Sequence, residues 1–193
     1  MKPLLSILFV CFSLCADAED FTNWYFALHS KPYVVSGSVE SADGTTIGSF
    51  VGISTGQENK EASTFTEEFE YTFLPSKVFT TFKMVWKKDE DGIYRASAVA
   101  SDGVQFKVEL EILSDTIYRL KFDASNGTTS VTEGKLGKNN TIQTRDRGFD
   151  SSNKLFGVMT YTQSRNLEVK KELENKPAED EQYVPPKYDR AGG

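Results

Sequence analysis

The sequence has little cysteine and histidine, which excludes several classes of protein. Only 2 of its 193 residues are cysteine and 1 is histidine. Both cysteines, Cys11 and Cys15, lie in an apolar N-terminal segment, so the rest of the chain offers no thiol for a disulfide or a metal site. The fold must therefore depend on packing and hydrogen bonds. The net charge of −6 argues against nucleic acid or anionic membranes as main partners, because both attract clusters of Lys and Arg.

Long apolar runs are also scarce, and the longest one lies at the N-terminus. Residues 4–14 are almost entirely apolar, follow Lys2 and precede the small-residue pattern Ala16-Asp17-Ala18. This order is typical of a secretory signal peptide, and the run is shorter than the roughly 20 residues that a transmembrane helix needs. We therefore expect a signal peptide at residues 1–18, entry into the endoplasmic reticulum lumen, and no membrane span in this chain.

Two Asn-x-Ser/Thr sequons fit passage through that compartment. They begin at Asn126 and Asn139 and read Asn-Gly-Thr and Asn-Asn-Thr. Such triplets are glycosylated when they lie in surface segments of a secretory protein. We predict that both asparagines are glycosylation sites.

The rest of the chain shows a hydrophobic period of two. Apolar and polar side chains alternate over residues 104–112, and the pattern recurs at 69–73 and 118–122. One apolar and one polar face is typical of strands in an antiparallel sheet with one buried side. Asp-Gly and Asn-Gly pairs, which favour tight hairpin turns, separate several of these runs. We predict strands near 33–41, 45–53, 68–74, 78–87, 93–100, 104–113, 117–123, 129–136 and 155–162.

Short strands joined by hairpins indicate an all-β fold. We expect an antiparallel meander that forms a β-sandwich or a small barrel, since both architectures have the same alternation. The domain is assigned to residues 19–163. Residues 164–193 are charged and contain Pro185-Pro186. We expect a short C-terminal helix over 164–176 and a disordered tail after it.

The sequence offers no convincing set of catalytic or metal-binding residues. The stretch Gly52-Ile53-Ser54-Thr55-Gly56 matches the G-x-S-x-G elbow of α/β-hydrolases, but no helical pattern follows it and His29 precedes Ser54. A lone histidine lacks the partners of a metal site, and the acidic run 89–91 lacks the spacing of a calcium loop. We therefore predict a protein that is not an enzyme and has no cofactor.

Aromatic residues gather just before the first predicted strand, at Phe21, Trp24, Tyr25 and Phe26. Aromatic side chains of this kind usually pack in a core. In front of a meander they could also line the ligand cavity of a lipocalin-like barrel, although Thr22 stands where the Gly-x-Trp of lipocalins has its glycine. A secreted barrel that binds a small apolar ligand is therefore kept as an alternative function.

Several segments resemble subunit 10 of the endoplasmic reticulum membrane protein complex. Asp91-Gly92-Ile93-Tyr94-Arg95 is similar to an Asp-Gly-hydrophobic-Tyr-Arg stretch of that family. Leu113-Ser114-Asp115, followed by residues 118–123, is similar to the entry into one of its strands. Leu28-His29-Ser30 and Lys187-Tyr188 resemble segments near its two ends.

This resemblance implies a luminal, non-enzymatic accessory subunit of a complex that inserts transmembrane segments. Its partners would be other subunits of that membrane complex, with Tyr94 and Arg95 contributing to the interface. Residues 69–75 also resemble a stretch of the α subunit of the translocon-associated protein complex, another luminal β-sandwich. Both resemblances imply a role in protein–protein interaction.

Overall fold

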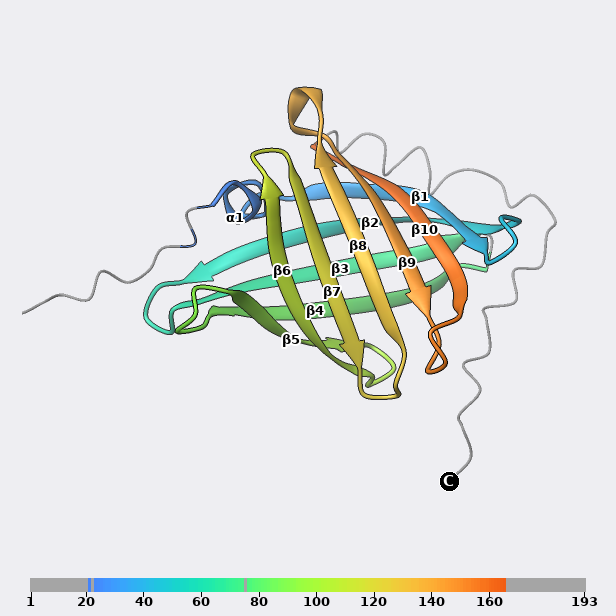
Figure 1. The fold of residues 1–193 in the computed structure, drawn as a ribbon. Coiled ribbons are helices and arrows are strands. Elements are labelled where there is room, and N and C mark those ends of the chain that lie inside the picture. The colour runs from blue at the N-terminus through green and yellow to red at the C-terminus, as the bar shows by residue number, and fades with distance from the viewer. Residues whose placement is uncertain (1–20, 22, 75, 166–193) are drawn as a thin grey trace, which may run out of the picture.

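The computed structural model describes residues 21, 23–74 and 76–165, and these residues form a closed β-barrel (Figure 1). Strands that are consecutive in the chain are neighbours in the sheet, and β1 pairs with β10 to close it. Each pair is antiparallel. The strands are β1 (Tyr33–Ser41), β2 (Thr46–Asn59), β3 (Thr64–Leu74), β4 (Val78–Lys88), β5 (Tyr94–Ala100), β6 (Gln105–Ser114), β7 (Ile117–Ala124), β8 (Thr129–Leu136), β9 (Ile142–Phe149) and β10 (Leu155–Ser164).

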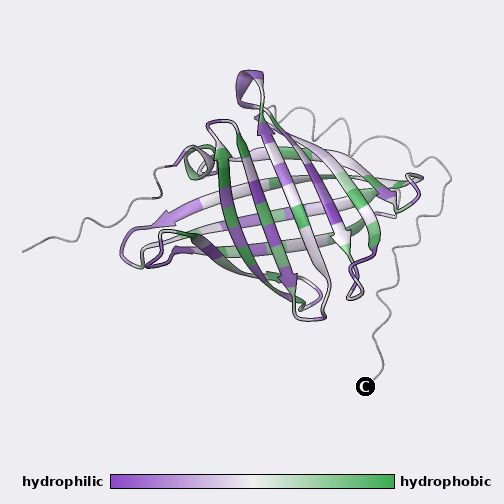
Figure 2. Cartoon of the chain, in the orientation of Figure 1, coloured by the Kyte–Doolittle hydropathy of each residue, from purple (hydrophilic) through white to green (hydrophobic). Residues whose placement is uncertain are grey.

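The alternation in the sequence gives the barrel wall its two faces. In β6, Val108 and Leu110 are buried inside while Lys107 is exposed outside. Residues directly opposite each other on paired antiparallel strands point to the same face of the sheet. The pairing therefore identifies which residues of each strand point into the barrel. Figure 2 shows the resulting alternation of hydrophobic and hydrophilic residues along the strands. The barrel is one of the two architectures that the alternation allowed.

A short helix closes one end of the barrel. Helix α1 (Trp24–His29) begins after Asn23, whose side chain accepts a hydrogen bond from the Phe26 N–H at 3.3 Å. The 3₁₀ helix η1 (Lys138–Asn140) and the β2–β3, β4–β5 and β6–β7 connections lie at this plugged end (Figure 1). The remaining hairpins lie at the opposite end, called the open end because neither described helix covers it. Within the described part of the chain, no helix is long and apolar enough to cross a bilayer.

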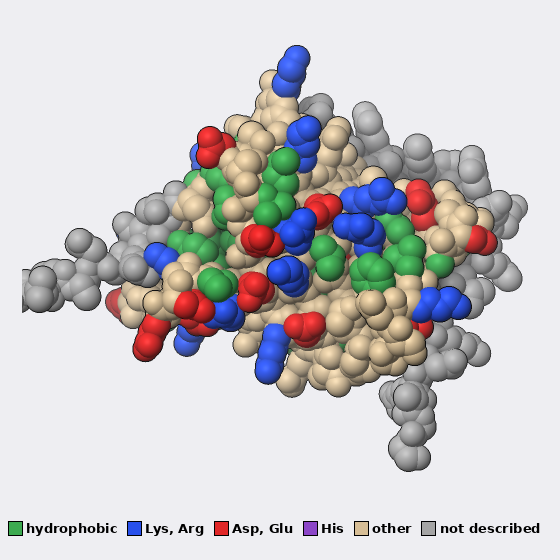
Figure 3. Space-filling view, in the orientation of Figure 1, with side chains coloured by type: hydrophobic (Ala, Val, Ile, Leu, Met, Phe, Trp, Pro, Cys, Tyr) green, Lys and Arg blue, Asp and Glu red, His purple; other side chains and the backbone are tan. Residues whose placement is uncertain are grey.

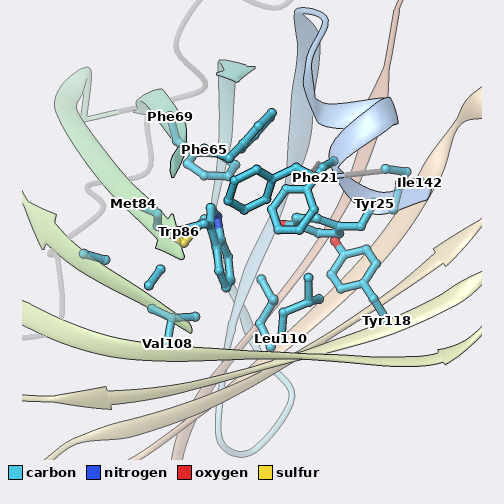
Figure 4. Close-up of a cluster of buried hydrophobic side chains, with 14 of the residues drawn as sticks. Phe21, Tyr25, Phe65, Phe69, Met84, Trp86, Val108, Leu110, Tyr118 and Ile142 are labelled. Carbon is cyan, nitrogen blue, oxygen red and sulfur yellow. The ribbon is translucent and has the colours of Figure 1, made fainter. Parts of the chain in front are cut away.

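The densest core lies beneath α1. The rings of Phe21 and Phe26 meet edge to face with centroids 4.7 Å apart, and Phe26 lies 5.0 Å from the ring of Phe65. Trp86 of β4 and Tyr118 of β7 are 0% and 1% exposed in the same cluster. Figure 4 shows these side chains filling the interior between the strands. The N-terminal aromatic residues therefore pack in the core, the more common of the two roles considered for them.

Charges of both signs cover the outer surface of β6 to β9. Arg119 lies between Glu133, at 2.8 Å, and Glu111, at 3.2 Å, while Arg147 lies 3.3 Å from Glu133. Figure 3 shows the two charge types interspersed on this face. Exposed pairs of this kind contribute little stability individually, but they keep a surface hydrated. Hydrophobic side chains also lie between these charges (Figure 3), and Leu113 of β6 is 41% exposed.

Three elements, β9, α1 and η1, lie where the sequence patterns predicted neither strand nor helix. The inward positions of β9 include Thr144, Asp146 and Gly148, so this strand has no apolar alternation. Helix α1 has only 6 residues, too few for a helical period to show. Strands β2 and β3 also extend farther toward the plugged end than the strands predicted at 45–53 and 68–74. The helix predicted over 164–176 falls outside the described residues, except that Ser164 ends β10 and Arg165 follows it.

Candidate functional site

Aromatic side chains line the inside of the barrel at the open end without being fully buried. They occupy inward-facing positions, yet each keeps partial exposure. Val78, an inward residue at the rim, is 45% exposed. These inward side chains therefore keep contact with solvent at the open end. The residues of this aromatic wall are Tyr71, Phe73, Phe82, Phe106, Phe122 and Tyr161.

Ring contacts divide the aromatic wall into two groups. Phe50 packs against Tyr71 and Tyr161, with centroids 5.5 and 5.7 Å away. On β4 and β6, the rings of Phe82 and Phe106 lie 5.4 Å apart. Between these two strands, β5 has alanine at its inward positions nearest the open end. Small side chains at this place allow the Phe82 and Phe106 rings to meet across β5.

Polar side chains on β8 and β9 interrupt the aromatic lining. Thr132 and Asp146 are directly opposite each other, and both face inward. The Thr132 hydroxyl donates a hydrogen bond to Asp146 Oδ1 at 2.8 Å. Thr132 is 4% exposed, whereas Asp146 keeps partial exposure. The inner wall is thus mostly apolar and carries a carboxyl group at one place.

The surroundings of these groups disfavour charge. Burial raises the pKa of Asp146 above its usual range, although the hydrogen bond from Thr132 opposes this effect. Burial is also the main reason that the pKa values of Tyr71 and Tyr161 lie well above their usual range. These side chains are therefore deep within the protein even though each keeps partial exposure.

A buried carboxylate connects α1 to the barrel beneath the aromatic wall. Glu67 of β3 is 0% exposed, and its Oε2 accepts hydrogen bonds from the Tyr25 hydroxyl at 2.9 Å and from Trp86 Nε1 at 2.8 Å. His29 Nδ1 donates to the Tyr25 carbonyl oxygen at 2.8 Å, and its Nε2 lies 3.9 Å from Glu67 Oε1. A buried charge is tolerated when such donors surround it. This network fixes the helix that forms the floor of the accessible space.

Ser54 lies within β2 and does not form a hydrolase elbow. Its side chain is 1% exposed, faces inward opposite Tyr33, and its hydroxyl has no hydrogen-bond partner among the described residues. A Cβ atom on Gly56 would lie 2.4 Å from the His29 carbonyl oxygen. The glycine is therefore explained by its close approach to α1, and the strand–turn–helix geometry of an elbow is absent at this place.

Tyr94 and Arg95, the residues of the implied interface, face opposite sides of β5. The Tyr94 ring packs inside, with its centroid 4.9 Å from that of Phe26. Arg95 lies outside, 3.0 Å from Asp91 and 3.5 Å from Glu109. Its hydrogen bonds lower the pKa of Asp91. Arg95 therefore presents a paired guanidinium to the surface, and the interface role of both residues stays a prediction.

Both predicted glycosylation sites lie in exposed turns, at opposite ends of the barrel. Asn126 is in the β7–β8 turn at the open end, where its Oδ1 accepts hydrogen bonds from the Thr128 N–H at 3.0 Å and the Thr128 hydroxyl at 2.7 Å. Asn139 lies in η1 with a φ of 57°. Glycosylation stays a prediction, and a glycan on Asn126 would stand beside the open end.

A hollow of about 670 Å³ lies at the β2–β3 hairpin, on the polar surface of the barrel. Lys83 and Glu68 in its lining are exposed and pair with each other at 2.7 Å. Within the described ranges, no three His, Cys, Asp or Glu side chains converge as a metal site. The hollow thus offers only hydrated surface groups, and the accessible interior is the stronger candidate site.

The sequence patterns did not identify Asp146 as a site residue, and they therefore did not predict the polar part of the inner wall. Asp146 stands between Arg145 and Arg147, so the local sequence resembles a hydrated surface segment. One feature of the sequence indicates an additional strand in this region. The stretch between the strands predicted at 129–136 and 155–162 is longer than most loops of compact domains, which suggests another strand within it.

No protein-family model and no curated protein matches this chain. Solved structures are similar to it at low identity. The S-type phycobiliprotein lyase CPES from Guillardia theta is 10% identical, with a TM-score of 0.55 over 74% of this chain and 90% of its own. The redesigned β-barrel mFAP0, solved bound to DFHBI, is 11% identical over 72% of this chain and 99% of its own, with a TM-score of 0.39. The similarity to the lyase shows the fold alone.

Proposed function

We propose that this barrel binds a small, largely apolar molecule in the open half of its interior. The observation that carries the proposal is the aromatic wall, whose rings face inward but keep partial exposure. Protein interiors are normally filled to a high density, so apolar surface left accessible inside a barrel is available to a ligand. Burial of that surface by a ligand is favoured by about 25 cal/mol per Å².

The size of the barrel supports this function. Eight-stranded barrels of the lipocalin kind hold one small ligand, and barrel diameter grows with the number of strands. This chain closes with β1 to β10, so its interior is wider, while α1 fills one end. Because α1 closes one end of the barrel, the site would have a single entrance at the open end. Most small-molecule sites are concave pockets of this kind. The function proposed is binding, and it requires no catalytic residue.

Binding can be measured with the neutral, solvatochromic dye Nile red. We expect its fluorescence to rise and saturate with the purified protein, and Ala100→Trp to weaken the affinity at least about tenfold by filling the space beside Phe82. The matched control is Val99→Trp on the outer face of the same strand, where Val99 is 43% exposed. Equal binding by the two variants, or no saturable binding by the wild type, would overturn the proposal.

The accessory role in membrane-protein insertion stays a prediction that rests on the sequence resemblance. Its direct test is co-purification of a tagged full-length chain with subunits of an endoplasmic reticulum membrane complex. Passage of the whole population into the medium, without such partners, would contradict it and would favour the secreted, ligand-binding alternative.

A further inference from the structure

We propose that the bound molecule is a planar aromatic cation whose positive group pairs with Asp146. This inference rests on the proposed binding function and names the ligand class. It starts from the position of one carboxyl group within a lining of aromatic, small apolar and uncharged polar side chains. Asp146 lies on β9 and faces the accessible interior, beside the aromatic wall.

The hydrogen bonding of Asp146 is incomplete. The Thr132 hydroxyl donates to Oδ1 at 2.8 Å, and the Ser130 side chain and the Arg147 N–H also bond to the carboxyl group, which can accept about four hydrogen bonds. Asp146 keeps partial exposure although it lies inside the barrel. Accessible acceptor capacity therefore points into the same space that the aromatic wall surrounds.

The charge of Asp146 also has no inward-facing counterpart in the open half. The inward positions of the described strands there carry no Lys or Arg. The adjacent Arg147 faces outward, 3.3 Å from Glu133. Burial raises the pKa of Asp146, and the attraction of Arg147 only partly opposes this effect, so the carboxyl group lacks a full counter-charge inside the barrel. A cationic ligand would supply the missing charge.

The walls around Asp146 favour a flat cation over a compact one. Tyr161 on the neighbouring β10 belongs to the aromatic wall, and its ring lies 5.7 Å from that of Phe50. Aromatic faces attract cations as well as planar apolar surfaces. An extended aromatic body would cover these rings while its charged end reaches β9. A small ammonium ion would leave the apolar surface uncovered.

Three dyes of different charge test the inference on the whole protein: cationic thioflavin T, neutral Nile red and anionic 1-anilinonaphthalene-8-sulfonate. We expect the wild type to prefer thioflavin T over the anionic dye. Asp146→Asn keeps the size of the side chain and an oxygen that can accept from Thr132. It should weaken thioflavin T binding about tenfold, as expected for loss of a charge-assisted contact, and change Nile red binding less than about threefold.

The matched control is Asp123→Asn, which removes an exposed, outward-facing carboxylate on β7. It should leave the affinity for each dye unchanged, and thermal unfolding confirms that both variants fold. If Asp146→Asn binds thioflavin T as tightly as the wild type does, the ligand-class inference fails while the binding function stands. If Nile red does not bind the wild type either, the binding function itself fails.

Discussion

At the scale of single residues, Asp146 and Glu67 show two ways of placing a carboxyl group inside one barrel. Glu67 is completely buried, and Tyr25 and Trp86 both donate to its Oε2, while its Oε1 has no hydrogen-bond partner among the described residues. Asp146 accepts hydrogen bonds from the Thr132 and Ser130 side chains and keeps partial exposure. A buried acid bonded to a helix and a strand supports structure, whereas an acid that keeps partial exposure at the open end is suited to recognition. Glu67 therefore supports the helix beneath the site, and Asp146 forms part of the wall of the site.

The raised pKa of Asp146 predicts a pH-dependent stability. Its folded-state pKa lies above the unfolded value, so the favourable contribution is complete at acid pH and is lost as the pH rises through the folded-state pKa. We expect Asp146→Asn, without ligand, to match the wild type near pH 3 and to have the higher free energy of unfolding at pH 7. Urea denaturation at both values measures this. A lower stability of the variant at pH 7 would show that the ionised carboxylate is favourable in the fold.

At the scale of elements, α1 depends on the Glu67 network because a helix of 6 residues is not stable alone. Its N-cap, Asn23, contributes one side-chain bond, and the Tyr25 hydroxyl provides a link to β3. Most of its stability must come from burial of Tyr25 and Phe26, which are each 1% exposed. The plug is therefore a tertiary feature that the short local sequence does not encode.

Glu67→Gln tests the link between helix and barrel. The change weakens two charge-assisted hydrogen bonds, and we expect a loss of about 1–3 kcal/mol in the free energy of unfolding. Glu68→Gln, on the exposed face next to it, should change the stability by less than about 0.5 kcal/mol, although it weakens an ion pair with Lys83. Chemical denaturation followed by tryptophan fluorescence measures both. Equal stabilities would mean that the buried carboxylate does not hold α1.

At the scale of the whole molecule, the β1–β10 pair converts a meander into a barrel. Its register runs from Val34 opposite Ser164 to Ser41 opposite Gly157. Gly37 lies in this seam, where a Cβ atom would be 2.3 Å from the Thr160 carbonyl oxygen and 2.5 Å from Tyr161 Cβ. Closure therefore requires a residue without a side chain at this position.

Gly37→Ala should disturb the seam. The added methyl group meets backbone, which cannot move as a flexible side-chain end can, so we expect a loss of about 1–3 kcal/mol. Ser38→Ala, one residue on and on the outer face, should change the stability by less than about 0.5 kcal/mol. Thermal unfolding of both variants provides the comparison. A Gly37→Ala protein as stable as the Ser38→Ala protein would show that the seam can widen at little cost.

The alternation of apolar and polar residues predicted the bounds of the strands well where that alternation is uninterrupted. β1 and β8 have the predicted bounds, and β6 and β7 lie within one residue of theirs. The prediction failed for β9, because its inward positions carry Thr144 and Asp146 in place of apolar residues. The same polar substitutions form the candidate site. A strand that contributes to recognition loses the apolar period by which a strand is found.

The sequence by itself determined the antiparallel order, the hairpins and the two faces of most strands, because these depend on neighbours in the chain. Only the tertiary structure decided that the meander closes, that α1 plugs one end, and that Asp146 faces inward. Closure requires β1 and β10 to pair across the length of the domain, and inside and outside are defined only once that pair forms. The candidate site depends on this long-range contact, which no local pattern encodes.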